Sequence, residues 1–119
     1  MCHVLIIEDE PLVAMMIEDV LLQAGATSAT IATTQAEAIA AANACRPEFI
    51  SSDVMLLEGT GPAAVAAIRS VHGAIPTLFI TATPAACEPC RAPDRILVKP
   101  FSARHVASAF EALAGPRCR

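Results

Sequence analysis

The expected fold is decided by the stretch Val4-Leu5-Ile6-Ile7-Glu8-Asp9-Glu10-Pro11. Its run of consecutive apolar residues is typical of a strand buried on both faces, as in a parallel sheet. The run ends abruptly in acidic residues, and Pro11 suits the first turn of a helix. Apolar residues then recur at helical spacing from Leu12 to Ala24, and Gly25 suits a helix C-cap. The stretch therefore predicts a buried strand, an acidic turn and a covering helix.

The same alternation continues along the chain. Further strands are expected at residues 27–33, 48–53, 76–81 and 95–98, and further helices at 35–44, 62–72 and 103–114. Strands that alternate with helices predict one α/β domain with a doubly wound, five-stranded parallel sheet covered on both faces. Between Thr81 and Lys99, prolines 84, 89 and 93 exclude a long regular helix, so the fourth helix is expected to be shortened.

Length, composition and net charge favour a single cytoplasmic domain and argue against several classes of protein. The chain has 119 residues, the size of one domain, and 55% of them are hydrophobic, which is ample for a core. The net charge of -4 argues against direct binding to nucleic acid or anionic lipid. The sequence offers neither a membrane-spanning run nor the basic start of a signal peptide, so we expect a cytoplasmic protein. Its five cysteines are an odd number, which in a reducing compartment argues against a disulfide framework.

Chemically useful side chains follow four of the expected strands. These residues are Glu8, Asp9, Asp53, Thr81 and Lys99. Because the parallel strands all end at one edge of the sheet, where open α/β sheets bind their ligands, we expect the five residues to converge there. Clustered carboxylates repel one another, and Mg²⁺, which prefers oxygen ligands, would relieve that repulsion. Asp53 could then act as a nucleophile towards a phosphoryl group, whose charge Lys99 and Thr81 would help to neutralise.

Four motifs in order resemble those of a known family. Glu8-Asp9, Ser52-Asp53-Val54-Met55-Leu56, Thr81-Ala82 and Lys99-Pro100-Phe101 are similar to the receiver-domain motifs of two-component response regulators. The resemblance covers nearly the whole chain, and it implies a flavodoxin-like receiver domain. Because the sequence ends at Arg119, we expect a single receiver domain over residues 1–119 with no output domain. Such a domain takes a phosphoryl group from a histidine kinase or phosphotransfer protein and signals through a protein target, without being a conventional turnover enzyme.

The resemblance also implies roles for individual residues. Asp53 would be the phosphoryl acceptor, with Thr81 and Lys99 on the phosphoryl oxygens. The Mg²⁺ ligands would be Glu8, Asp9, Asp53 and the backbone carbonyl of Met55. The Lys99-Pro100 bond resembles the family's cis peptide, which would aim Lys99 into the site.

Three departures from the family pattern stand out. Leu57 occupies a position where the family usually has proline, which we expect to alter the loop but not the chemistry. Ile96 stands where many receivers carry a switch Tyr or Phe, so the readout of activation is expected to differ. The segment between Thr81 and Lys99 is short, which argues against carrying over a standard dimer.

Two alternatives remain open from the sequence. The chain could be a pseudo-receiver that works by phosphorylation-independent protein contact, or a thiol redox or metal protein that uses Cys87 and Cys90. For the receiver interpretation, the outward side of the first helix is expected to offer a partner-docking patch that includes Pro11, Ala14 and Met15.

Overall fold

The elements of the computed structural model follow the predicted alternation. The structure describes residues 1–82 and 94–118. In chain order the elements are β1 (His3–Ile7), α1 (Pro11–Gln23), β2 (Ser28–Ala32), α2 (Gln35–Ala44), β3 (Phe49–Asp53), α3 (Gly61–His72), β4 (Thr77–Thr81), β5 (Arg95–Val98), α4 (Ala103–Ala114) and a 3-10 helix (Gly115–Cys118). The predicted α/β class is confirmed, whereas the shortened fourth helix, Cys87 and Cys90 lie outside the described residues.

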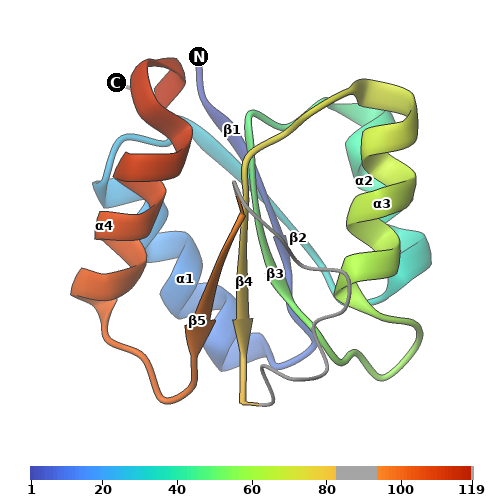
Figure 1. Cartoon of the computed structure of the whole chain (residues 1–119), viewed down its shortest axis with the longest axis horizontal. Coiled ribbons are helices and arrows are strands. Elements are labelled where there is room, and N and C mark those ends of the chain that lie inside the picture. The colour runs from blue at the N-terminus through green and yellow to red at the C-terminus, as the bar shows by residue number, and fades with distance from the viewer. Residues whose placement is uncertain (83–93, 119) are drawn as a thin grey trace.

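All five strands are parallel, in the order β2-β1-β3-β4-β5. Helices α1 and α4 cover one face of the sheet, and α2 and α3 cover the other (Figure 1). The chain winds outward from β1 to β2 and then returns to place β3 on the other side of β1, so the point of reversal lies between β1 and β3. Ligands of such sheets bind at the carboxyl ends of the strands beside this point.

Alternate residues of the central strands supply two separate cores. Val4 and Ile6 belong to the apolar cluster under α1 and α4, whereas Leu5 and Ile7 belong to the cluster under α2 and α3. This is why β1 reads as an unbroken apolar run. Within the described residues no helix is long and apolar enough to cross a membrane.

One sequence expectation about the cysteines is wrong. Cys2 and Cys118 form a disulfide across a separation of 116 residues, with Cα atoms 4.9 Å apart. The pair meets because α4 returns the chain to the edge of the sheet where β1 begins, so the N- and C-terminal segments lie close together (Figure 1). Both cysteines are buried, whereas Cys45 is free and exposed. Counting cysteines could not reveal a contact between residues this far apart in sequence.

We predict that this disulfide stabilises the fold. In a variant that keeps only this pair, with Cys45, Cys87 and Cys90 replaced by serine, reduction should lower the free energy of unfolding by about 3–5 kcal/mol, because the cross-link no longer restricts the unfolded chain. Urea unfolding followed by circular dichroism, with and without a reductant, measures the difference. The same variant carrying Cys2→Ser serves as the control and should not respond to the reductant. Equal midpoints in the oxidised and reduced pair would contradict the prediction.

Candidate functional site

The strand register brings the predicted site residues to one edge of the sheet. Glu8 and Asp9 directly follow β1, and Lys99 directly follows β5. Asp53 and Thr81 are the last residues of β3 and β4, where Asp53 is paired with Ile80, the residue before Thr81. Sequence position alone had predicted this convergence, and the structure brings these residues together.

Three carboxylates form the centre of the site. One carboxylate oxygen from each of Glu8, Asp9 and Asp53 lies within 4.8 Å of the other two. The Glu8 side chain is fully buried, Asp53 is nearly so, and Asp9 is half-buried. Hard oxygen donors so close together fit a small divalent cation such as Mg²⁺. Met55, whose backbone carbonyl is the fourth expected ligand, lies two residues beyond Asp53, and its role stays a prediction.

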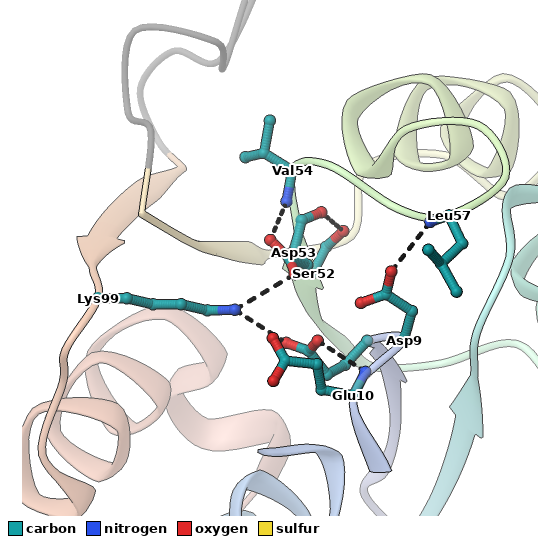
Figure 2. A network of polar contacts seen from close by, with 8 residues as sticks. Asp9, Glu10, Ser52, Asp53, Val54, Leu57 and Lys99 are labelled. Atoms are coloured by element: carbon teal, nitrogen blue, oxygen red, sulfur yellow. Dashed lines mark hydrogen bonds and ion pairs between the residues drawn. The ribbon is translucent and has the colours of Figure 1, made fainter. Parts of the chain in front are cut away.

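Lys99 provides positive charge to this cluster. Its Nζ lies 3.3 Å from Asp53 Oδ2 and 3.4 Å from Glu8 Oε1 (Figure 2). The Lys99-Pro100 peptide bond is cis, as the family resemblance implied. The backbone N–H of Lys99 donates to the Thr81 carbonyl at 2.8 Å, which ties the end of β5 to the end of β4. The ammonium therefore reaches two carboxylates from a backbone that is itself anchored.

Each carboxylate also accepts a backbone N–H. Val54 donates to Asp53 Oδ1 at 2.7 Å, and Glu10 donates to Glu8 Oε2 at 3.1 Å. For these two carboxylates the other oxygen is the one that faces Lys99. The backbone amides thus fix the orientation of the carboxylates as well as stabilising their charge.

The third carboxylate, Asp9, accepts a backbone hydrogen bond from Leu57, a residue for which the sequence predicted no role in the site. The N–H of Leu57 donates to Asp9 Oδ2 at 2.9 Å, and Figure 2 shows the other Asp9 oxygen turned towards the side on which Asp53 and Lys99 lie. The backbone of Leu57 thus contacts a candidate metal ligand, whereas the expectation that this residue leaves the chemistry untouched stays a prediction. No side-chain pattern could have shown this, because the contact is made by the backbone.

Two further residues support Asp53 and had no role in the sequence analysis. The buried Ser52 hydroxyl donates to the Asp53 carbonyl at 2.7 Å (Figure 2). Gly61 donates its N–H to the Val54 carbonyl at 2.9 Å, and a Cβ atom at position 61 would overlap the Asp53 carbonyl oxygen. Only glycine lets α3 begin this close to the end of β3. The signal available in the sequence is the glycine-rich stretch Glu58-Gly59-Thr60-Gly61, which directly precedes the helix expected at 62–72.

Burial and charge shift the pKa values of this site. Burial raises the pKa of Glu8 to about 7, and the negative charge of Asp53 acts in the same direction, against the Glu10 amide and Lys99. For Lys99, burial favours the neutral form, but the carboxylates of Glu8 and Asp53 outweigh it and raise the pKa of the ammonium. Lys99 therefore stays charged, whereas Glu8 can hold a proton near neutral pH.

Metal-free protein should lose stability as the pH rises from about 4.5 to about 7. Over this range the folded state holds the Glu8 proton and the unfolded state does not, so folding is favoured at the acidic end. The loss due to Glu8 is of the order of 3 kcal/mol at most. Urea unfolding at a series of pH values in EDTA measures it.

Glu8→Gln should remove this part of the pH dependence, because the amide does not titrate. Asp19→Asn, at an exposed position on α1, is the control and should keep the wild-type slope. If Glu8→Gln and wild type lost stability equally between these pH values, the assignment of the effect to Glu8 would be wrong.

Comparisons with known proteins agree with this geometry. A profile of the response regulator receiver domain matches residues 4–111. Among characterised sequences, the chain is 33% identical over 114 residues to the probable transcriptional regulatory protein TcrX of Mycobacterium tuberculosis, covering 92% of this chain and 48% of TcrX. It is 34% identical over 110 residues to the phyllosphere-induced regulator PhyR of Methylorubrum extorquens, covering 89% of this chain and 41% of PhyR. The chain thus spans less than half the length of either relative.

Solved structures show the same fold. The receiver domain of PhyR from Erythrobacter litoralis superposes with a TM-score of 0.83 at 30% identity, covering 94% of this chain and 88% of that one. The chemotaxis protein CheY4 of Vibrio cholerae superposes with a TM-score of 0.79 at 27% identity, covering 95% and 98%. The profile match, the flavodoxin-like sheet and the acidic edge agree, and the chain belongs to the response regulator receiver domains, which are signalling modules of two-component systems rather than metabolic enzymes.

Proposed function

We propose that this domain accepts a phosphoryl group on Asp53, in a Mg²⁺-dependent step, from a phosphohistidine of a histidine kinase or phosphotransfer protein. The observation that carries this proposal is the position of the Lys99 ammonium, in contact with both Asp53 and Glu8 inside a cluster of three carboxylates. A buried carboxylate that is oriented by an amide and faces a cation is suited to nucleophilic attack on phosphorus. We place the reaction in the cytoplasm because the phosphohistidine donor is made from ATP.

The groups of this chain can be assigned to the steps of such a transfer. An Asp53 oxygen forms the new O–P bond while the P–N bond of the phosphohistidine breaks, and the departing imidazole nitrogen keeps the electron pair and takes up a proton. Lys99, and Thr81 at the end of β4, would bind the phosphoryl oxygens. The Val54 amide keeps the Asp53 carboxylate in a fixed orientation. Glu8, Asp9, Asp53 and the Met55 carbonyl would hold Mg²⁺, which would supply further positive charge for the transferring phosphoryl group.

Mass spectrometry of the intact protein after incubation with acetyl phosphate tests this proposal. Wild type should gain one phosphoryl group with Mg²⁺ and none in EDTA, whereas Asp53→Asn should gain none under either condition. If acetyl phosphate does not phosphorylate wild type, the experiment is repeated with a purified, phosphorylated phosphotransfer protein as the donor. Phosphorylation of Asp53→Asn at the wild-type level would show that Asp53 is not the acceptor, and a wild type inert to both donors would point to a pseudo-receiver.

An apolar stripe on α1 is the proposed docking site for the donor. Leu12, Met15 and Met16 recur at helical spacing and are 82%, 57% and 42% exposed. The expectation that Ala14 belongs to this surface is wrong, because Ala14 faces the core and is buried. Since α1 begins two residues after Asp9, the stripe lies beside the acidic cluster, where a donor must approach. Exposed apolar patches of this kind mark protein contacts.

Replacing exposed apolar residues of the α1 stripe should slow phosphorylation by a protein donor but not phosphorylation by a small-molecule donor. Leu12→Ser combined with Met15→Ser should slow phosphotransfer from a protein phosphohistidine by about tenfold or more, because central apolar contacts commonly contribute over 1 kcal/mol to binding. Phosphorylation by acetyl phosphate should be unchanged, since that donor needs no docking surface. The control is Val71→Ser, which alters a 70% exposed apolar residue on α3, on the other face of the sheet. Equal transfer rates for the control and the stripe variant would place docking elsewhere.

A second candidate function rests on Ile96. This residue lies on β5, paired with Phe79 and 40% exposed, at the position of the usual aromatic switch. A domain that does not move an aromatic ring could contact its target regardless of phosphorylation. Among the structural relatives is an anti-anti-sigma factor, PhyR of Bartonella quintana, so an anti-sigma factor is one class of target to test. Target affinity that does not change when a beryllofluoride phosphate mimic is added would favour this candidate.

A further inference from the structure

The contact between Leu57 and Asp9 depends on which residue occupies position 57. The Leu57 N–H donates to Asp9 Oδ2 at 2.9 Å. Proline, the usual residue of the family at this position, has no N–H and could not make this bond. The Leu57 side chain is 86% exposed, so its packing does not account for the contact. What leucine supplies here, relative to proline, is a backbone donor.

The donor is held in place by the loop around it. A backbone bridge between Met55 and Thr60 closes the loop that carries Leu57. The N–H of Gln35 donates to the Glu58 carbonyl at 3.1 Å, and the Gln35 side chain accepts the N–H of Thr60 at 3.2 Å. The loop is therefore fastened to the start of α2 on one side and to the end of β3 on the other. A donor fixed in this way can restrain the side chain that it contacts.

Asp9 is the carboxylate of the cluster that most needs such a restraint. It is half-buried, whereas Glu8 and Asp53 are buried and also contact Lys99. Repulsion by the Asp53 carboxylate, and by Glu8 when it is ionised, favours conformations in which Asp9 points towards solvent and away from the cluster. A hydrogen bond from Leu57 to one oxygen opposes this movement and leaves the other oxygen turned towards the cluster (Figure 2).

We propose that the backbone N–H of Leu57 is a positioning group for the Mg²⁺ site, which holds Asp9 ready to bind the ion. The inference rests on the proposed function, because it concerns the same metal site. It adds that position 57 sets the affinity for the metal. Partners that orient a metal-binding side chain commonly change affinity by tenfold or more when they are removed.

Isothermal titration of Mg²⁺ into wild type, Leu57→Pro and Leu57→Ala tests the proposal. Leu57→Pro removes the donor and should raise the Kd for Mg²⁺ by about tenfold. Leu57→Ala removes the exposed side chain but keeps the donor, so its Kd should stay within about twofold of wild type. The proposal is overturned if Leu57→Pro binds Mg²⁺ as tightly as Leu57→Ala or more tightly. If wild type itself binds no Mg²⁺, it is the proposed metal site that fails, together with everything that rests on it.

Nuclear magnetic resonance gives a second readout that needs neither activity nor a proline variant that folds. In metal-free wild type, the hydrogen bond to a carboxylate should place the Leu57 amide proton downfield of an ordinary loop amide. Asp9→Ala should move this resonance upfield, whereas Asp19→Ala, an exposed acid of α1, should leave it in place. An amide proton that does not respond to the loss of Asp9 would show that the bond does not form in solution, and the proposal would fall.

Discussion

The mutual repulsion of three carboxylates at one sheet edge is the constraint on which the rest of this structure depends. One carboxylate oxygen from each of Glu8, Asp9 and Asp53 lies within 4.8 Å of the other two, and the side chains of Glu8 and Asp53 are buried. Charges this close and this poorly solvated raise one another's pKa unless cations or donors offset them. Lys99 contacts two of the carboxylates, and each of the three accepts one backbone N–H. The cluster is thus stabilised by contacts from four residues, which are Glu10, Val54, Leu57 and Lys99.

The fold supplies those contacts through its parallel topology. Strands that run in one direction end at one edge, so residues far apart in sequence arrive there together with their backbone amides. Close approach of the elements completes the arrangement, because Gly61 allows α3 to begin against the Asp53 carbonyl. At the other edge of the sheet, the Cys2–Cys118 disulfide fastens the start of β1 to the turn after α4. Strand β1 therefore runs from a covalent anchor directly to the acidic cluster.

Most of the fold, and the side chains of the site, could be predicted from the sequence because local patterns encode them. Apolar runs identified the strands within two residues at either end, and residues at the strand ends identified Glu8, Asp9, Asp53, Thr81 and Lys99. The contacts that the sequence did not predict are those that leave no local pattern of residue types. The disulfide joins residues 116 positions apart, and the Leu57 donor belongs to the backbone. Ala14 was assigned to the wrong side of α1, because its helix is apolar on nearly all sides and the outward face could not be chosen from composition.

The same geometry bears on how phosphorylation would be transmitted. A phosphoryl group on Asp53 would add negative charge where Lys99 now divides its contacts between Asp53 and Glu8. The Lys99 ammonium would then shift its contacts towards the phosphoryl group. Because the Lys99 N–H donates to the Thr81 carbonyl, a movement of Lys99 would be transmitted to the end of β4. In receivers with an aromatic residue on β5, a ring reports such a change. Ile96 has no ring to rotate, so phosphorylation of Asp53 in this chain would have to be transmitted through Lys99 and the end of β4.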